Sequence, residues 1–110
     1  MDELITWLRG VLDEDERLAR EATHYNMITI ESRSRAEEDH ARRHDPAAVL
    51  ADIAAKRAIL DKWHVKTRWA SRHPSTDFGD GEIWGIEAAL RLLASAYADR
   101  PGYRDEWSVT

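Results

Sequence analysis

The sequence contains no cysteine among its 110 residues. This absence excludes disulfide bonds, thiolate metal sites, iron–sulfur clusters and cysteine nucleophiles. No apolar run approaches the ~20 residues of a membrane span, so we expect no membrane association. The first residues, Met1 to Glu3, are acidic, and neither a basic segment nor a small-residue cleavage site follows them. The sequence therefore predicts a cytoplasmic protein without a secretory signal.

Several signatures of catalysis are also missing. No serine lies in a nucleophile elbow, and no glycine-rich loop is present to hold phosphates. The triplet Asp77-Phe78-Gly79 lacks the other kinase motifs and indicates a capping turn before a helix. A chain of this length is too short for a Rossmann unit with a substrate domain and suits one domain over residues 1–110. We therefore expect a protein that is not an enzyme and needs no cofactor.

Three stretches have apolar residues at three- and four-residue spacing, which is typical of amphipathic helices. They cover about residues 2–23, 46–64 and 82–98. Asp45-Pro46 is a strong start for the second, because aspartate caps a helix and proline fits its first position. The third is the most apolar, and its predicted buried face comprises Ile83, Ile86, Leu90, Leu93 and Tyr97, with Trp84, Leu92 and Ala94 beside it. The fold class is therefore mainly α, a small bundle of three principal helices.

Three segments outside these helices carry signals of their own. Residues 24–34 are rich in β-branched and apolar types and predict either a short strand or an apolar joint. A strand there would need a partner strand, which a second copy in a homodimer would supply. Residues 65–81 contain many turn formers and predict a long flexible loop. The tail, about residues 99–110, holds two aromatic anchors and is expected to fold back onto the body.

The segment 56–73 has six basic residues against one acidic residue in an otherwise acidic protein. Basic groups interleaved with tryptophans suit contact with phosphates and stacking on single-stranded bases. The candidate nucleic-acid-binding residues are Lys62, Trp63, Lys66, Arg68, Trp69 and Arg72. The alternative interpretation is a basic helix end that complements the helix dipole, followed by a solvated loop with a core tryptophan.

His40 and His44 are spaced i, i+4, which allows two histidines on a helix to hold one metal ion. Pro46 would end such a helix at about His44, and the sequence is not H-E-x-x-H, because Ala41 follows His40. The alternative is a pair of solvated histidines in a charged stretch. A metal-dependent enzyme using this pair is accordingly a further hypothesis.

Charges of opposite sign are separated along the chain. Residues 1–21 carry seven acidic and three basic residues, and residues 77–87 carry four acidic residues and no basic one. Such a separation can match one protomer to another, or to a basic protein partner. It favours a protein partner or a homo-oligomer. The alternative is a set of ordinary solvated faces.

Three blocks of the sequence together resemble a known family. They are the Leu8–Leu18 block with Leu12-Asp13-Glu14-Asp15-Glu16, the block from Arg43-His44-Asp45-Pro46 to Arg57, and the block Leu90–Trp107. The chain resembles a family of small uncharacterised, domain-of-unknown-function proteins of actinobacteria and their phages. The resemblance implies an actinobacterial or bacteriophage origin and a cytosolic setting, and it implies no activity, cofactor or catalytic residue.

These observations together predict a small accessory protein that is not an enzyme and acts through a protein partner or as a homodimer. A nucleic-acid-associated regulator that uses the segment 56–73 is the alternative. The number of protomers and the identity of any partner stay open at this point.

Overall fold

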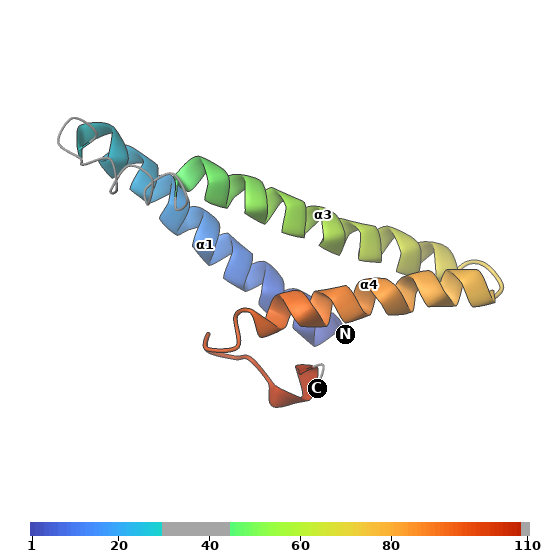
Figure 1. Ribbon diagram of the computed structural model, residues 1–110. Coiled ribbons are helices and arrows are strands. Elements are labelled where there is room, and N and C mark those ends of the chain that lie inside the picture. The colour runs from blue at the N-terminus through green and yellow to red at the C-terminus, as the bar shows by residue number, and fades with distance from the viewer. Residues whose placement is uncertain (30–44, 109–110) are drawn as a thin grey trace. The chain divides into compact units, whose positions relative to one another are not determined.

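The computed structural model describes residues 1–29 and 45–108 (Figure 1). Three helices, α1 (Asp2–Thr29), α3 (Pro46–Ala70) and α4 (Asp77–Ser95), are followed by a short 3-10 helix, η2 (Asp105–Trp107). Within the described residues there is no strand. The expected mainly α fold with three principal helices is confirmed. None of the helices described is both long enough and apolar enough to cross a membrane.

Helix α1 is longer than the sequence pattern predicts. Leu4, Leu8 and Leu12 lie four residues apart and are fully buried, while Asp2 and Glu3 occupy the first turn, where the helix dipole favours acids. The helix continues to Thr29, so residues 24–29 are helical and the strand predicted there is not found. Extending a nucleated helix costs less than starting a strand without a partner strand. Residues 30–34 lie outside the described residues.

The chain forms two compact units. The first unit comprises residues 1–11 and 57–110, and the second comprises residues 12–56. Within the first unit, α1 and α3 are joined by an ion pair between Arg9 and Asp61 at 3.8 Å. The buried apolar side chains of this unit are Leu4, Ile5, Leu8, Val11, Leu60, Trp63, Leu90, Ala94 and Trp107.

Among the residues of the second unit whose burial the structure describes, few side chains are buried and many are charged. The buried apolar residues among them are Leu12, Ala19 and Ile53. Arg17 donates hydrogen bonds to the carboxylates of Glu14 and Glu21, which lie one turn before and after it on the exposed side of α1. The hydrogen bond to Glu14, with the negative charges of both acids, raises the pKa of the Arg17 guanidinium above its ordinary value. The acidic run that starts at Asp13 is thus partly neutralised within its own helix.

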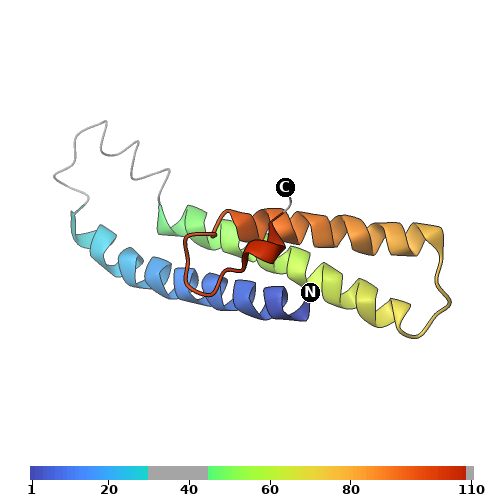
Figure 2. The same ribbon diagram turned by 90° about the horizontal axis from the view of Figure 1, so that it is seen from below.

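The C-terminal tail folds back onto the first unit, as predicted (Figure 2). The ring of Trp7 in α1 lies 5.6 Å from that of Tyr103 and 5.3 Å from that of Trp107, centroid to centroid. The indole N–H of Trp7 donates a hydrogen bond to the carbonyl of Pro101 at 2.8 Å. Arg104 forms an ion pair with Glu3. The tail is therefore held to the first turns of α1 by aromatic and polar contacts together.

The loop predicted over residues 65–81 is too long. Helix α3 continues to Ala70 rather than ending at His64, and α4 begins at Asp77 rather than at Glu82, so only residues 71–76 join them. Val65 and Trp69 prolong the apolar spacing of α3 by one turn. The glycines at 79 and 81, interpreted as turn formers, are tolerated within the first turns of α4, at a cost of about 1 kcal/mol each.

Candidate functional site

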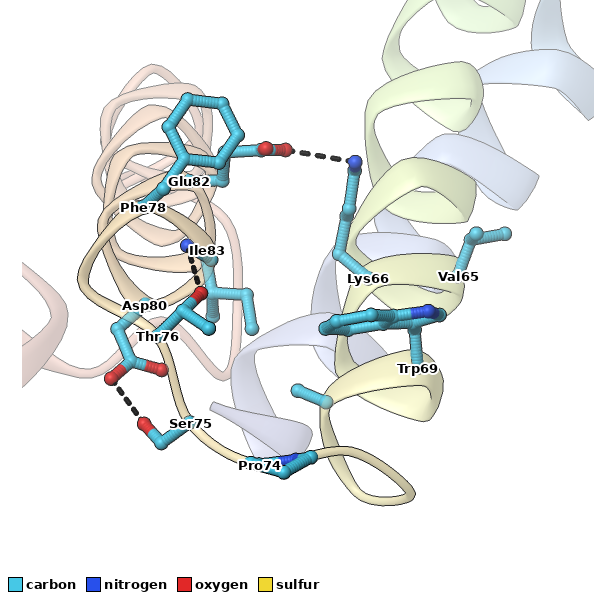
Figure 3. A pocket seen from close by; sticks show the side chains of 12 residues that line it. Val65, Lys66, Trp69, Pro74, Ser75, Thr76, Phe78, Asp80, Glu82 and Ile83 are labelled. Atoms are coloured by element: carbon cyan, nitrogen blue, oxygen red, sulfur yellow. Dashed lines mark hydrogen bonds and ion pairs between the residues drawn. The ribbon is translucent and has the colours of Figure 1, made fainter.

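A groove lies between the last turns of α3 and the first turns of α4, within the first unit (Figure 3). Its volume is about 220 Å³. Val65 and Trp69 line it from α3, and Phe78 and Ile83 line it from α4. The indole of Trp69 projects from α3 into the space between the two helices. The walls are thus mainly apolar side chains on two helices that are joined by a six-residue connection.

The connection is shaped by side chains that satisfy helix ends. The hydroxyl of Thr76 caps α4 by accepting a hydrogen bond from the backbone N–H of Gly79 at 3.0 Å. A Cβ at position 79 would lie 2.9 Å from that hydroxyl oxygen, so a side chain there would require the Thr76 hydroxyl to shift. The hydroxyl of Ser75 donates to the carboxylate of Asp80. These contacts set the start of α4 and hence the position of Phe78.

Side chains also contact backbone carbonyl groups at the end of α3. The Ser71 hydroxyl donates to the carbonyl of Arg68 at 2.7 Å, and the Nδ1 of His73 lies 2.8 Å from the carbonyl oxygen of Trp69. The imidazole of His73 also stacks on the indole of Trp69, with centroids 4.0 Å apart and planes at 7°. One face of the Trp69 indole is therefore covered by His73, which limits the orientations that the ring can adopt.

The groove exposes large apolar groups to solvent. The exposed fraction is 64% for Val65, 50% for Trp69 and 79% for Phe78. Burial of such groups releases about 25 cal/mol per Å² of apolar surface, so a partner that covers them gains binding free energy. At the rim, the ammonium of Lys66 and the carboxylate of Glu82 form an ion pair at 2.8 Å across the groove. This pair neutralises two charges beside the apolar walls and joins α3 to α4.

The family model for the Family of unknown function (DUF6221) matches residues 1–109, almost the whole chain. This protein belongs to the DUF6221 family. No curated protein and no solved structure matches the sequence. The resemblance carried by the three sequence blocks is thus confirmed at the level of a family of unknown function.

The predicted nucleic-acid-binding residues of this DUF6221 protein do not share one surface. Trp63 is buried, and its indole N–H donates to Glu87 of α4 at 3.1 Å, so it is a core residue that cannot stack on a base. Lys66 is held in its ion pair with Glu82. Lys62, Arg68 and Arg72 are exposed, and Trp69 lines the groove. The predicted set is therefore divided between the core, the groove and the solvent.

The predicted metal pair, His40 and His44, lies outside the described residues. Within residues 1–29 and 45–108, no three histidine, aspartate or glutamate side chains converge as ligands for a metal ion.

Three of the groove residues, Val65, Phe78 and Ile83, are not recognisable from the sequence pattern as parts of one site. Interpreting residues 65–81 as a loop hides the helical spacing of Val65 and Trp69. The signal that could have found the groove is Thr76 followed by Asp77 and Asp80, since threonine is a preferred N-cap and acids favour the first turn of a helix. A helix starting at Asp77 places Phe78 next to the end of α3.

Proposed function

We propose that this protein is a non-enzymatic interaction protein that binds a protein partner in the groove between α3 and α4. The observation that carries the proposal is the half-exposed Trp69 indole, fixed by His73 and placed opposite Ile83 and Phe78. Tryptophan is enriched among the residues that dominate the binding energy of protein interfaces, especially where it meets a well-packed pocket. An indole already held by stacking also loses little side-chain freedom on binding.

The occupant that suits these walls is one apolar side chain presented by a partner protein. The groove volume of about 220 Å³ is below the usual range of cofactor and drug-sized pockets, roughly 300–1,000 Å³. It is large enough for an aliphatic or aromatic side chain. The Lys66–Glu82 pair at the rim offers both a donor and an acceptor for backbone groups beside that side chain.

The test compares capture of proteins by tagged variants from an actinobacterial lysate, with and without nuclease, read by mass spectrometry. We expect one partner to bind the wild type and Leu18→Ala, to resist nuclease, and to be lost with Trp69→Ala. Leu18 is the matched control, because it is exposed to a similar extent, 47%, and lies on α1. With the purified partner, Trp69→Ala should raise the Kd at least about ten-fold. Equal binding by both variants would contradict the proposal.

A second candidate function is contact with single-stranded nucleic acid. Trp69 is half exposed, and Lys62, Arg68 and Arg72 are exposed and form no ion pair within the described residues. In this function, a base would stack on the Trp69 indole, and the three cations would contact the phosphates of the same strand. It predicts that the captured material disappears after nuclease treatment. It also predicts that replacing Arg68 and Arg72 by glutamate abolishes a gel shift.

The source and compartment are part of the same proposal. The resemblance carried by the three sequence blocks supports an actinobacterial or phage-encoded protein that acts in the cytoplasm. Tagged protein in an actinobacterial host should therefore remain in the cytosolic fraction. Recovery in the membrane or the medium would contradict this part.

A further inference from the structure

The side of α4 that faces away from the core carries large exposed apolar side chains. The exposed fraction is 74% for Trp84 and 59% for Leu92, although the sequence pattern placed both beside the buried face. Gly81 precedes Trp84 and Gly85 follows it on the same side of the helix, and a Cβ added at either glycine would meet no atom within 4 Å. We define the α4 outer face as Gly81, Trp84, Gly85, Ala88 and Leu92.

Two charged residues stand at the ends of this face. Asp77, Trp84 and Arg91 are spaced by seven residues, which brings them within about 20° of one line along the helix. All three are exposed. Neither Asp77 nor Arg91 forms an ion pair or a side-chain hydrogen bond within the described residues. The line therefore runs from an exposed acid, through an exposed indole, to an exposed base.

The charges along this line are complementary to those of a second copy of α4 that runs in the opposite direction. A second α4 laid antiparallel, with a two-fold axis at Trp84, brings Asp77 of each copy opposite Arg91 of the other. The two Trp84 indoles then meet at the centre. Such a closed two-fold arrangement is the commonest form of self-association among soluble proteins. A different protein would need this charge pattern by coincidence, whereas a second copy supplies it.

We propose that the α4 outer face binds the same face of a second copy of this chain, as an antiparallel two-helix contact. Gly81 and Gly85 carry no side chain beside Trp84, so they leave room on this face for the indole of the second copy. A helix of 19 residues is about 28 Å long. One such face is smaller than the ~800 Å² per partner that a stable complex buries. We therefore expect a weak dimer that forms only at high protein concentration. The contact is independent of the α3–α4 groove.

The test is sedimentation equilibrium of the full chain from about 1 μM to about 1 mM, the range in which a weak dimer dissociates. We expect a monomer–dimer equilibrium for the wild type. Asp77→Arg and Arg91→Asp each place like charges opposite one another twice, and each should raise the Kd about ten-fold or more. Arg68→Asp is the matched control for Arg91→Asp, because it makes the same charge change on α3, and it should leave the Kd unchanged.

Mixing the two charge variants gives the decisive result. In a mixed pair, the arginine introduced at position 77 of one variant faces the aspartate introduced at position 91 of the other. The unchanged Arg91 and Asp77 of the two variants face each other as in the wild type, so every pair is again attractive. An equimolar mixture should therefore regain the wild-type Kd as a heterodimer.

A variant at the other end of the face tests the contact even if Asp77→Arg fails to fold. Leu92→Glu leaves the start of α4 intact and buries a charge in the proposed contact, so it should abolish the dimer. Its helicity by circular dichroism should equal that of the wild type. It replaces Asp77→Arg if that variant loses helicity.

Three results would overturn the proposal. They are a wild type that stays monomeric to about 1 mM, charge variants and Leu92→Glu that dimerise like the wild type, and folded charge variants that fail to recover on mixing. The first would assign the face to a different protein or to another part of this chain. The groove variant Trp69→Ala should dimerise normally, so failure of the proposed groove function and failure of the dimer are separable.

Discussion

The indole N–H of Trp63 in α3 donates a hydrogen bond to the carboxylate of Glu87 in α4 at 3.1 Å. The two residues lie 24 positions apart and join the helices that form the groove. Trp63 is buried, with 7% of its surface exposed, and Glu87 is half-buried. The carboxylate thus satisfies the one polar atom of a core side chain, which would otherwise be buried without a partner.

Removing this acceptor should lower the stability of the fold. We expect Glu87→Ala to reduce the free energy of unfolding by about 1–2 kcal/mol, because the indole N–H loses a charged acceptor. Glu87→Gln keeps an oxygen in place and should cost about half as much or less. Urea denaturation followed by tryptophan fluorescence measures both. Equal losses for the two variants would show that the hydrogen bond is not the cause.

Gly102 should not tolerate a side chain. Its φ is +91°, and an added Cβ would lie 2.9 Å from two atoms of the Trp7 ring. Gly102→Ala should therefore destabilise the fold by about 1–3 kcal/mol in a thermal or urea melt. Gly10→Ala is the control, since a Cβ there meets nothing within 4 Å, and it should stabilise by about 0.5–1 kcal/mol. A neutral Gly102→Ala would contradict the close contact between the tail and α1.

Trp107 should be the main anchor of the C-terminal tail. It is 9% exposed and contacts the rings of Trp7 and Tyr103. Trp107→Ala should cost about 3–5 kcal/mol of stability and release the tail to limited proteolysis. Trp84→Ala removes the same side chain from an exposed position and should change the monomer's stability by less than about 0.5 kcal/mol. The pair is best compared at low micromolar concentration, where the proposed dimer is dissociated.

The Thr76 cap should set both the stability of α4 and the shape of the groove. Thr76→Ala leaves the backbone N–H of Gly79 without its hydroxyl partner and should cost about 1 kcal/mol. Thr76→Ser keeps the hydroxyl and should behave like the wild type. Hydrogen exchange of the first turn of α4 provides the measurement. If that turn exchanges equally fast in both variants, the cap does not determine the start of α4.

The helical fold class follows from the amino-acid sequence alone, because apolar residues repeat at helical spacing in three stretches and each helix needs only its own backbone hydrogen bonds. The return of the tail is also predictable, since Tyr103 and Trp107 are large apolar groups in a polar segment. The ends of the helices are not. Glycines 79 and 81 indicate a turn by local propensity, whereas the Thr76 cap and the packing of Ile83 and Leu90 favour a helix.

Which aromatic residues are core and which are exposed depends on how the helices pack. Trp63 and Trp69 lie six residues apart on α3, so they point to different sides of the helix, and the position of α4 determines which side is covered. Trp63 finds Glu87 there, and Trp69 lies at the edge of the contact. Trp84 and Leu92 are apolar in sequence yet exposed, because burial depends on the partner that faces a residue and not on the residue alone.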